Sequence, residues 1–306
     1  MPLCVNERSD GGESMVRMDE IDVVGCPGTR RAWLQRAMAG LVACLASGAW
    51  ALEGGSGPQD PLSGAPWSAV GSLAAGQRLL SAVAIAPRWV LTAAHAVNGA
   101  QSADVVFRTP LGGGFSSRAR TVHVHPAFIS GKVDLALVEL EQRVPPGMAI
   151  AQVFTGALPG RLIQLVSHGG STTLITRGEN RIDAVQPGAL GEPLLYLFDY
   201  DTEPTSPPAE EGAAATAGLG PGREATLVSG DSGSAAFVVI DGRWGLAGIN
   251  TFQATVTPRE GGVSTRLAGG IVLASQTAWI ARAMRGEPSP QPAPRPGPTA
   301  GHTATP

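Results

Sequence analysis

The chain has 306 residues and a formal net charge of −3 at pH 7. This balance excludes the strongly basic surface of nucleic-acid-binding proteins and the long acidic run of a solvating tail. Hydrophobic residues make up 43% of the chain, enough for a sizeable core, and 41 glycines with 25 prolines favour turns and short strands over long helices.

Residues 1–51 are predicted to be an N-terminal extension that carries an export signal. A basic stretch at 29–36 precedes small apolar residues that end in Ala49-Trp50-Ala51. The apolar stretch is too short for a comfortable membrane-spanning helix, and the A-x-A ending is typical of a signal-peptidase site. We expect cleavage after Ala51 and a periplasmic or secreted protein without a stable membrane span. A short buried helix is the alternative.

The route of export stays open at this point. Residues 29–35 resemble a twin-arginine signal, although paired arginines are common in any basic leader. Residues 41–44 resemble a lipoprotein box, but only seven uncharged residues separate Arg36 from Cys44, so lipidation ranks below simple cleavage. All three cysteines lie before residue 50, so the mature protein would contain no disulfide.

Residues 66–273 are predicted to form short β-strands separated by glycine, proline and polar turns. Asp241-Gly242 is a hairpin signal, because both central positions of a two-residue turn of this kind require a positive φ. Helical periodicity is confined to residues 276–284. Strands without interleaved helices predict an all-β sandwich or barrel rather than a parallel α/β sheet. The strand-like runs are 81–86, 104–107, 135–140, 162–166, 237–240 and 244–249.

Two segments are expected to lie outside the core. Residues 202–224 form a surface insertion rich in proline, alanine and glycine. Residues 286–306 form a proline-rich tail that cannot bury enough apolar area to offset the entropy of ordering it, so disorder is predicted. A spacer or recognition segment is the alternative for the tail.

Three motifs supply an imidazole, a carboxylate and a hydroxyl in chain order. A serine hydroxyl is a poor nucleophile until a base removes its proton, and a third group must hold that base in the correct tautomer. The motifs are WVLTAAH at 89–95, DLALVEL at 134–140 and GDSGS at 230–234, and the candidate groups are His95, Asp134 and Ser232. Alone, the histidine is more often structural and G-D-S-G is an ordinary turn; together the motifs favour catalysis.

These motifs and further segments resemble the trypsin/chymotrypsin family of serine peptidases, here as a bacterial member without disulfides. The resemblance runs from residue 52 to residue 285. It implies an all-β fold of two six-stranded antiparallel β-barrels, residues 52–150 and 151–285, with the active site between them and a short C-terminal helix. The additional matching segments are HPAF at 125–128, GINTF at 248–252, GGVSTRL at 261–267 and TAWI at 277–280.

The resemblance assigns a role to each group. His95 would be the general base and then the general acid, Asp134 would orient its ring, and Ser232 would be the nucleophile. The backbone N–H groups of Gly230 and Ser232 would form the oxyanion hole. Ser234 replaces a glycine that is usual in the family.

In the family, the carboxylate at the position of Asp231 pairs with a newly formed amino terminus. Cleavage after Ala51 would expose Leu52-Glu53-Gly54-Gly55, which loosely resembles the family's mature start. We therefore expect the Leu52 ammonium to pair with Asp231, with an internal arginine as the competing partner.

By the same alignment, Thr226 lies at the base of the substrate pocket, with Gln253 and Gly262 on its walls. Thr251 stands where the family commonly has a serine that donates to the catalytic aspartate, and Phe252 follows it in the strand that aligns substrate. No carboxylate lies at the pocket base, so arginine and lysine are disfavoured and small or medium uncharged side chains are expected.

The leading prediction is a monomeric, exported serine endopeptidase that hydrolyses a protein or peptide substrate through an acyl-enzyme. A catalytically silent protease-like binding module and an esterase with the same nucleophile are the alternatives. No nucleic acid partner, cofactor or metal is expected. His123 and His125 have the spacing of two ligands on one strand face, but no carboxylate or cysteine accompanies them.

Overall fold

The computed structural model describes residues 51–55, 65–108, 113–172, 174–201, 218–219, 222–256 and 265–287. Contacts divide the chain into two units, Met1–Gly48 and Ala49–Pro306, and every described residue belongs to the second. The predicted export signal, most of the insertion at 202–224 and nearly all of the tail at 286–306 lie outside the described residues. Within these ranges, no helix has the length and apolar character needed to cross a membrane.

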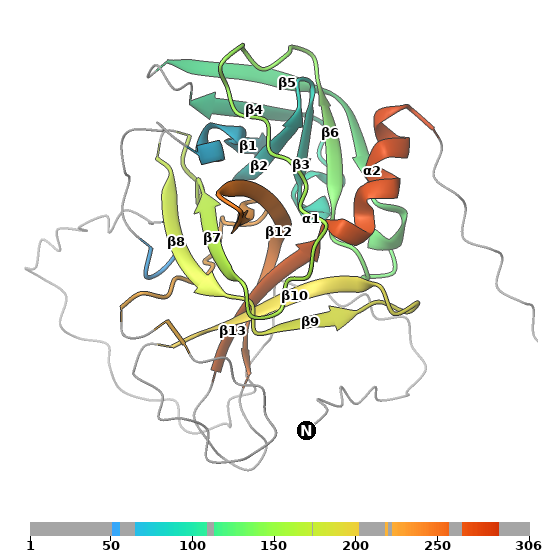
Figure 1. Ribbon diagram of the computed structural model, residues 1–306. Coiled ribbons are helices and arrows are strands. Elements are labelled where there is room, and N and C mark those ends of the chain that lie inside the picture. The colour runs from blue at the N-terminus through green and yellow to red at the C-terminus, as the bar shows by residue number, and fades with distance from the viewer. Residues whose placement is uncertain are drawn as a thin grey trace, which may run out of the picture. The chain divides into compact units, whose positions relative to one another are not determined.

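The first half of the described chain forms a closed barrel of six antiparallel strands in the order β1-β2-β3-β6-β5-β4 (Figure 1). In β2, five consecutive residues from Leu80 to Ala84 are buried, because one face lines the barrel and a loop of the second half covers the other. This barrel has the strand number predicted for the region. Its strands are β1 Val70–Ala75, β2 Arg78–Ala86, β3 Trp89–Thr92, β4 Ala103–Arg108, β5 Gly114–Val124 and β6 Ala136–Leu140.

The second half forms an antiparallel sheet of seven strands in the order β8-β7-β11-β12-β13-β10-β9. Its β8 and β10 approach each other, since the Asn180 side chain in β8 donates to the Asp199 carbonyl oxygen in β10 at 2.7 Å. The sequence predicted six strands here, and the structure has one more, because Ala184–Pro187 pairs with β10 as an added edge strand. The strands are β7 Leu162–Ser167, β8 Thr176–Arg181, β9 Ala184–Pro187, β10 Pro193–Tyr200, β11 Ala235–Ile240, β12 Arg243–Val256 and β13 Thr265–Val272.

The predicted hairpin and C-terminal helix are both present. Asp241 and Gly242 form the turn between β11 and β12 with φ values of 50° and 74°. The helix α2, Thr277–Met284, follows a 3₁₀ turn at Ala274–Gln276. A single helical turn directly after β3, α1 Ala94–Val97, gives no sequence signal of its own because it is too short for a periodic pattern. Further 3₁₀ turns cover Ala65–Ala69 and Pro126–Phe128.

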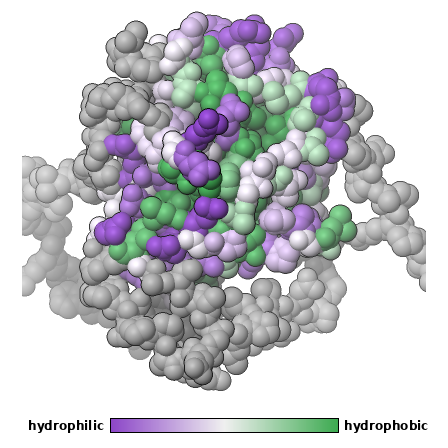
Figure 2. Space-filling view, viewed as in Figure 1, coloured by the Kyte–Doolittle hydropathy of each residue, from purple (hydrophilic) through white to green (hydrophobic). Residues whose placement is uncertain are grey.

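Buried apolar residues join the two halves into one packed body. The Trp67 ring centre lies 4.7 Å from that of Trp244 and 5.7 Å from that of Phe237, so the segment before β1 packs on strands of the seven-stranded sheet. On α2, Trp279 packs edge-on against His125 at 4.8 Å. Figure 2 shows apolar patches on one face, with hydrophilic residues between and around them. This packing fixes the two halves against each other, so groups from both can share one site.

Candidate active site

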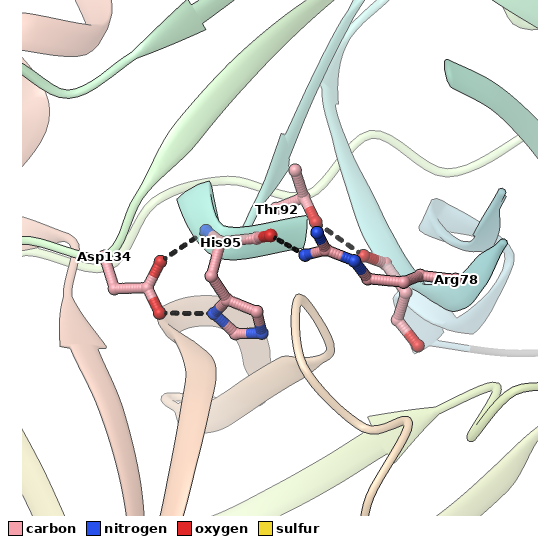
Figure 3. Close-up of polar contacts among 5 residues, drawn as sticks. Arg78, Thr92, His95 and Asp134 are labelled. Atoms are coloured by element: carbon pink, nitrogen blue, oxygen red, sulfur yellow. Dashed lines mark hydrogen bonds and ion pairs between the residues drawn. The ribbon is translucent and has the colours of Figure 1, made fainter. Parts of the chain in front are cut away.

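His95 and Asp134 lie beside each other because the strands next to them are paired. His95 follows β3 and Asp134 precedes β6, and the register places Thr92 opposite Ala136. His95 Nδ1 lies 2.6 Å from Asp134 Oδ2, and the His95 backbone N–H donates to Asp134 Oδ1 at 2.9 Å (Figure 3). The carboxylate thus holds both the backbone and the ring of the histidine. It also fixes the proton on Nδ1, which leaves Nε2 as the basic nitrogen.

Ser232 lies in the loop before β11, and this loop packs directly on the first barrel. The Ser81 N–H in β2 donates to the Ser232 carbonyl oxygen at 2.9 Å. Gly233 has a φ of +82°, and a Cβ there would overlap the Ser81 carbonyl oxygen, so only glycine fits. The same carbonyl accepts from the Thr92 hydroxyl at 2.8 Å, three residues before His95. Ser81 therefore links the loop of the candidate nucleophile to the segment that carries the histidine.

The Ser232 hydroxyl and His95 are not joined by a hydrogen bond among the contacts of the described residues. Contacts of this kind are often long in an unliganded enzyme and tighten when substrate binds. His95 Nε2 points away from Asp134 (Figure 3), and the His95 side chain is 36% exposed, so substrate can reach this nitrogen.

The two predicted oxyanion donors face no competing acceptor. Neither the Gly230 nor the Ser232 N–H donates to an acceptor in the part of the chain that the structure describes. Gly230 has a φ of +103°, which favours glycine, and a Cβ there would lie 3.1 Å from the Gly169 carbonyl carbon. Two free N–H groups on a tightly held turn can donate hydrogen bonds to a carbonyl oxygen that becomes negative.

A buried polar chain that the sequence did not predict supports the same loop. The Tyr196 hydroxyl donates to Asn250 Oδ1 at 2.6 Å, and Asn250 Nδ2 donates to the Ser234 hydroxyl at 2.8 Å. The main chain of Asn250 also bonds to Gly233 and Ser234, at 2.8 and 2.9 Å. Burial raises the pKa of the Tyr196 hydroxyl well above its usual value, so it remains a donor. This chain gives a physical reason for a serine at 234 in place of the family's usual glycine.

Asp231 is fully buried and accepts three hydrogen bonds. The donors are the Ser167 hydroxyl at 2.6 Å, the Val228 N–H at 2.7 Å and the Leu52 N–H at 3.1 Å. Burial raises the pKa of Asp231 to about 6, and these three hydrogen bonds oppose the increase. None of the donors is an arginine, the competing partner considered from the sequence. The structure brings Leu52 and Asp231 together instead.

The segment around Leu52 is held tightly. Ala51 and Leu52 are 3% and 1% exposed, and Leu52 has a φ of 60°, a conformation that non-glycine residues rarely adopt. Glu53 forms a β-bridge with Thr226, and its carboxylate lies 2.7 Å from the Arg266 guanidinium. The peptide bond predicted to be cleaved during export is therefore inside the folded body.

The predicted pocket residues are only partly brought together. Thr226 is buried and its N–H donates to the Glu53 carbonyl at 2.9 Å. Phe252 is half-buried and Gln253 exposed, while Gly262 lies outside the described residues. Thr251 is 7% exposed, and no hydrogen bond joins it to Asp134 within the described ranges.

Strand pairing identifies two residues opposite the predicted pocket wall that the alignment missed. Phe252 and Gln253 in β12 lie opposite Gly269 and Ala268 in β13. A Cβ on Gly269 would lie 3.0 Å from the Phe252 ring, so a larger side chain there would crowd the ring. The pairing register, which no local motif encodes, would have been needed to find these two residues from the sequence.

Two more polar features gave no sequence signal. Arg78, the first residue of β2, donates from Nη1 to the His95 carbonyl oxygen (Figure 3). Asp199, Asp201 and Glu224 place carboxylate oxygens within 4.8 Å of one another, an arrangement that a cation could use. Both Glu224 oxygens already accept main-chain N–H groups, from Asp201 and Leu219 at 2.8 Å, so the cluster has a structural role without an ion.

Comparison with known proteins agrees with the fold described above. A family model described as Trypsin matches residues 54–270. A solved structure of a Glu endopeptidase in complex with MPD matches with a TM-score of 0.52 and 13% sequence identity, covering 78% of this chain and 99% of that chain. At this identity the likeness concerns the fold alone. No curated protein sequence matches the chain.

Proposed function

Because the chain belongs to the trypsin family, we propose that it is a serine endopeptidase that cleaves peptide bonds through an acyl-enzyme. The observation that carries the proposal is the 2.6 Å contact between His95 Nδ1 and Asp134 Oδ2, which orients the ring and leaves Nε2 available. Support also comes from the loop of Ser232, which is hydrogen-bonded to the neighbouring strand β2.

In the proposed mechanism, Ser232 Oγ attacks the substrate carbonyl carbon while His95 Nε2 takes the hydroxyl proton. Asp134 keeps the other proton on Nδ1 and stabilises the imidazolium. The N–H groups of Gly230 and Ser232 bind the oxyanion, and one such donor typically contributes about 3 kcal/mol to transition-state stabilisation. When the C–N bond breaks, His95 returns the proton to the leaving amine. A water molecule, deprotonated by His95, then attacks the ester and frees the serine.

Removal of an export signal is the proposed activating step. The Leu52 nitrogen, an amide in the intact chain, already lies 3.1 Å from Asp231. Cleavage after Ala51 would convert it into an ammonium and the hydrogen bond into a buried ion pair next to the oxyanion donors. Since the cleaved peptide bond is buried after folding, cleavage must precede docking of this segment. The active protein would then work in the periplasm or in the medium.

The proposed substrates carry a small or medium uncharged residue before the cleaved bond. Thr226 supplies a hydroxyl rather than a carboxylate at the expected pocket base, so a substrate cation would find no counter-charge there. Gln253 adds a polar side chain at the expected entrance.

Labelling with a fluorophosphonate probe tests the nucleophile. The mature protein should be labelled at Ser232, while Ser232→Ala should not be labelled and should not cleave a peptide library. Absence of labelling would favour a catalytically silent binding module. Labelling with ester hydrolysis but no peptide cleavage would favour an esterase. Peptide cleavage that persists in Ser232→Ala would refute the mechanism.

A further inference from the structure

Arg78 is an exposed cation at the edge of the candidate active site, and the mechanism above does not use it. Its guanidinium approaches the main chain of His95 from the side opposite to Asp134 (Figure 3). The His95 carbonyl oxygen is its one hydrogen-bond partner among the described residues, and no described carboxylate lies within 4.0 Å of it. A guanidinium has five N–H donors, so most of this donor capacity faces solvent.

The way Arg78 is held favours binding of a carboxylate. A guanidinium presents its donors in a planar fork that fits the two oxygens of a carboxylate. The bond to the His95 carbonyl fixes the position of this fork beside the His95 main chain, so less side-chain entropy is lost when a ligand binds. Arg88, just after the other end of β2, differs: its Nη1 binds the Glu141 carbonyl at 2.5 Å on the barrel, away from Ser81 and the Ser232 loop.

The position of Arg78 indicates which half of a substrate it can reach. The oxyanion donors and β12 belong to the second half of the chain, and they would hold the carbonyl side of the cleaved bond. His95 and Arg78 belong to the first barrel, and His95 Nε2 must lie at the leaving nitrogen to protonate it. The residues that follow the leaving nitrogen therefore pass over the start of β2.

We propose that Arg78 binds a carboxylate in the leaving-group half of the substrate, so that the enzyme prefers bonds followed within two residues by that charge. This inference rests on the proposed endopeptidase function and adds to it a substrate class. An Asp or Glu side chain and a free C-terminal carboxylate offer the same chemistry, and the experiment separates them.

The test compares matched peptides that differ only in charge after the cleaved bond. A digest of a C-terminally amidated peptide library first identifies a good substrate. In one series, Glu or Gln then occupies each of the two positions after the cut. In a second series, a short peptide ends two residues after the cut as a free acid or as an amide. kcat/KM is measured for the wild-type protein, Arg78→Gln, Arg78→Lys and the matched control Arg88→Gln.

In the wild-type protein we expect the charged peptide of one series to be cleaved roughly two- to fivefold faster, an effect of the size given by exposed ion pairs. The ratio of kcat/KM for the charged peptide to kcat/KM for its uncharged counterpart should fall to about one in Arg78→Gln. It should persist in part in Arg78→Lys and remain at the wild-type value in Arg88→Gln. High salt should reduce it. If the Glu peptide is the one cleaved faster than its Gln counterpart, Arg78 binds a side-chain carboxylate. If the free acid is the one cleaved faster than its amide, Arg78 binds a C-terminal carboxylate.

Two results would overturn the role of Arg78: a ratio of about one in an active wild-type protein for both series, or a ratio that survives in Arg78→Gln. Failure of the endopeptidase proposal looks different. In that case the wild-type protein would cleave none of the peptides, or Ser232→Ala would cleave them as well, and the role of Arg78 would fall with it.

Discussion

The main-chain nitrogen of Leu52 lies 3.1 Å from Oδ2 of Asp231, a residue 179 positions later and directly before the candidate nucleophile. The carboxylate is buried, and its hydrogen-bond donors carry no positive charge. This arrangement explains why the pKa of Asp231 is raised to about 6 in the uncleaved chain. A cation at the Leu52 nitrogen would offset part of the cost of burying a charged carboxylate.

The first prediction concerns alkaline pH. A free α-amino group usually has a pKa of about 7.7–8.0, and pairing with Asp231 should raise it. The stabilisation that the Leu52–Asp231 ion pair gives to the active conformation is therefore fully present below the usual pKa of the α-amino group. It is lost as the pH rises through the raised pKa of that group. We expect kcat/KM of the cleaved protein to decline above about pH 8.

A pH profile of the mature protein, with N-terminal sequencing, checks this. Asp231→Asn should abolish the alkaline decline along with most activity, because it removes the counter-charge. A mature protein that starts at any residue other than Leu52, or one whose activity is equal with and without cleavage, would contradict the activation step.

The second prediction concerns the tautomer of His95. Asp134→Asn keeps the size of the side chain but allows the imidazole to carry its proton on Nε2, where it cannot act as a base. We expect kcat to fall by about 10⁴-fold at neutral pH. Because Asp134 is only partly buried, thermal stability should change little.

The matched control is Glu139→Gln, also a carboxylate-to-amide change in the same region, in β6. Its carboxylate lies 3.6 Å from the Arg120 guanidinium on the barrel surface, so activity should stay near wild type. Equal kcat values for the two variants would exclude Asp134 from catalysis.

The strands and the candidate triad were accessible to sequence analysis because their signals are local. Runs such as 81–86 and 162–166 alternate or stay apolar over a strand's length, and Asp241-Gly242 specifies its own turn. His95, Asp134 and Ser232 each lie in a motif of several residues. The extra edge strand at Ala184–Pro187 was missed because its four residues are mostly exposed and carry no apolar pattern.

The remaining site residues depend on contacts between distant positions. Arg78 belongs to no sequence motif, and only the fold brings its guanidinium to the His95 carbonyl oxygen. Tyr196 and Asn250 lie in different strands, 54 positions apart, and their hydrogen bond depends on the sheet order. Ala268 and Gly269 follow from the pairing register of β12 with β13, which no local sequence motif encodes.

The third prediction concerns the buried chain from Tyr196 to Ser234. Tyr196→Phe leaves Asn250 Oδ1 without its donor, and an unpaired buried acceptor costs about 1–3 kcal/mol. If the chain positions the loop of Ser232, kcat should fall several-fold while KM changes little. Ser234→Gly should have a similar effect, and the two changes together should cost less than their sum, with a coupling of at least about 0.5 kcal/mol.

Steady-state kinetics and urea unfolding of the two single variants and the double variant check this. Tyr200→Phe is the control, since it removes a hydroxyl from the same strand β10 at a half-buried position away from Asn250. Additive losses, or a loss of stability with unchanged kcat, would show that the chain supports the sheet without positioning the nucleophile.

The fourth prediction concerns stability between pH 4 and pH 7. Burial, aided by neighbouring carboxylates, raises the pKa of Asp183 to about 6 and of Asp199 to about 7. Both groups would titrate near 3.9 in the unfolded chain, so the folded state binds more protons between about pH 4 and pH 7. The free energy of unfolding should therefore decrease as pH rises through this window.

Urea unfolding at pH 4.5 and pH 7.5 measures the effect. Asp199→Asn should reduce the difference between the two pH values, because an amide needs no proton to stay neutral. The decrease should not vanish, since Asp183 titrates in the same direction and so does Asp231 wherever Leu52 remains an amide. Asp241→Asn, a substitution in the exposed β11–β12 turn, is the control and should keep the wild-type difference. A protein that becomes more stable as pH rises from 4.5 to 7.5 would show that other carboxylates outweigh this cluster.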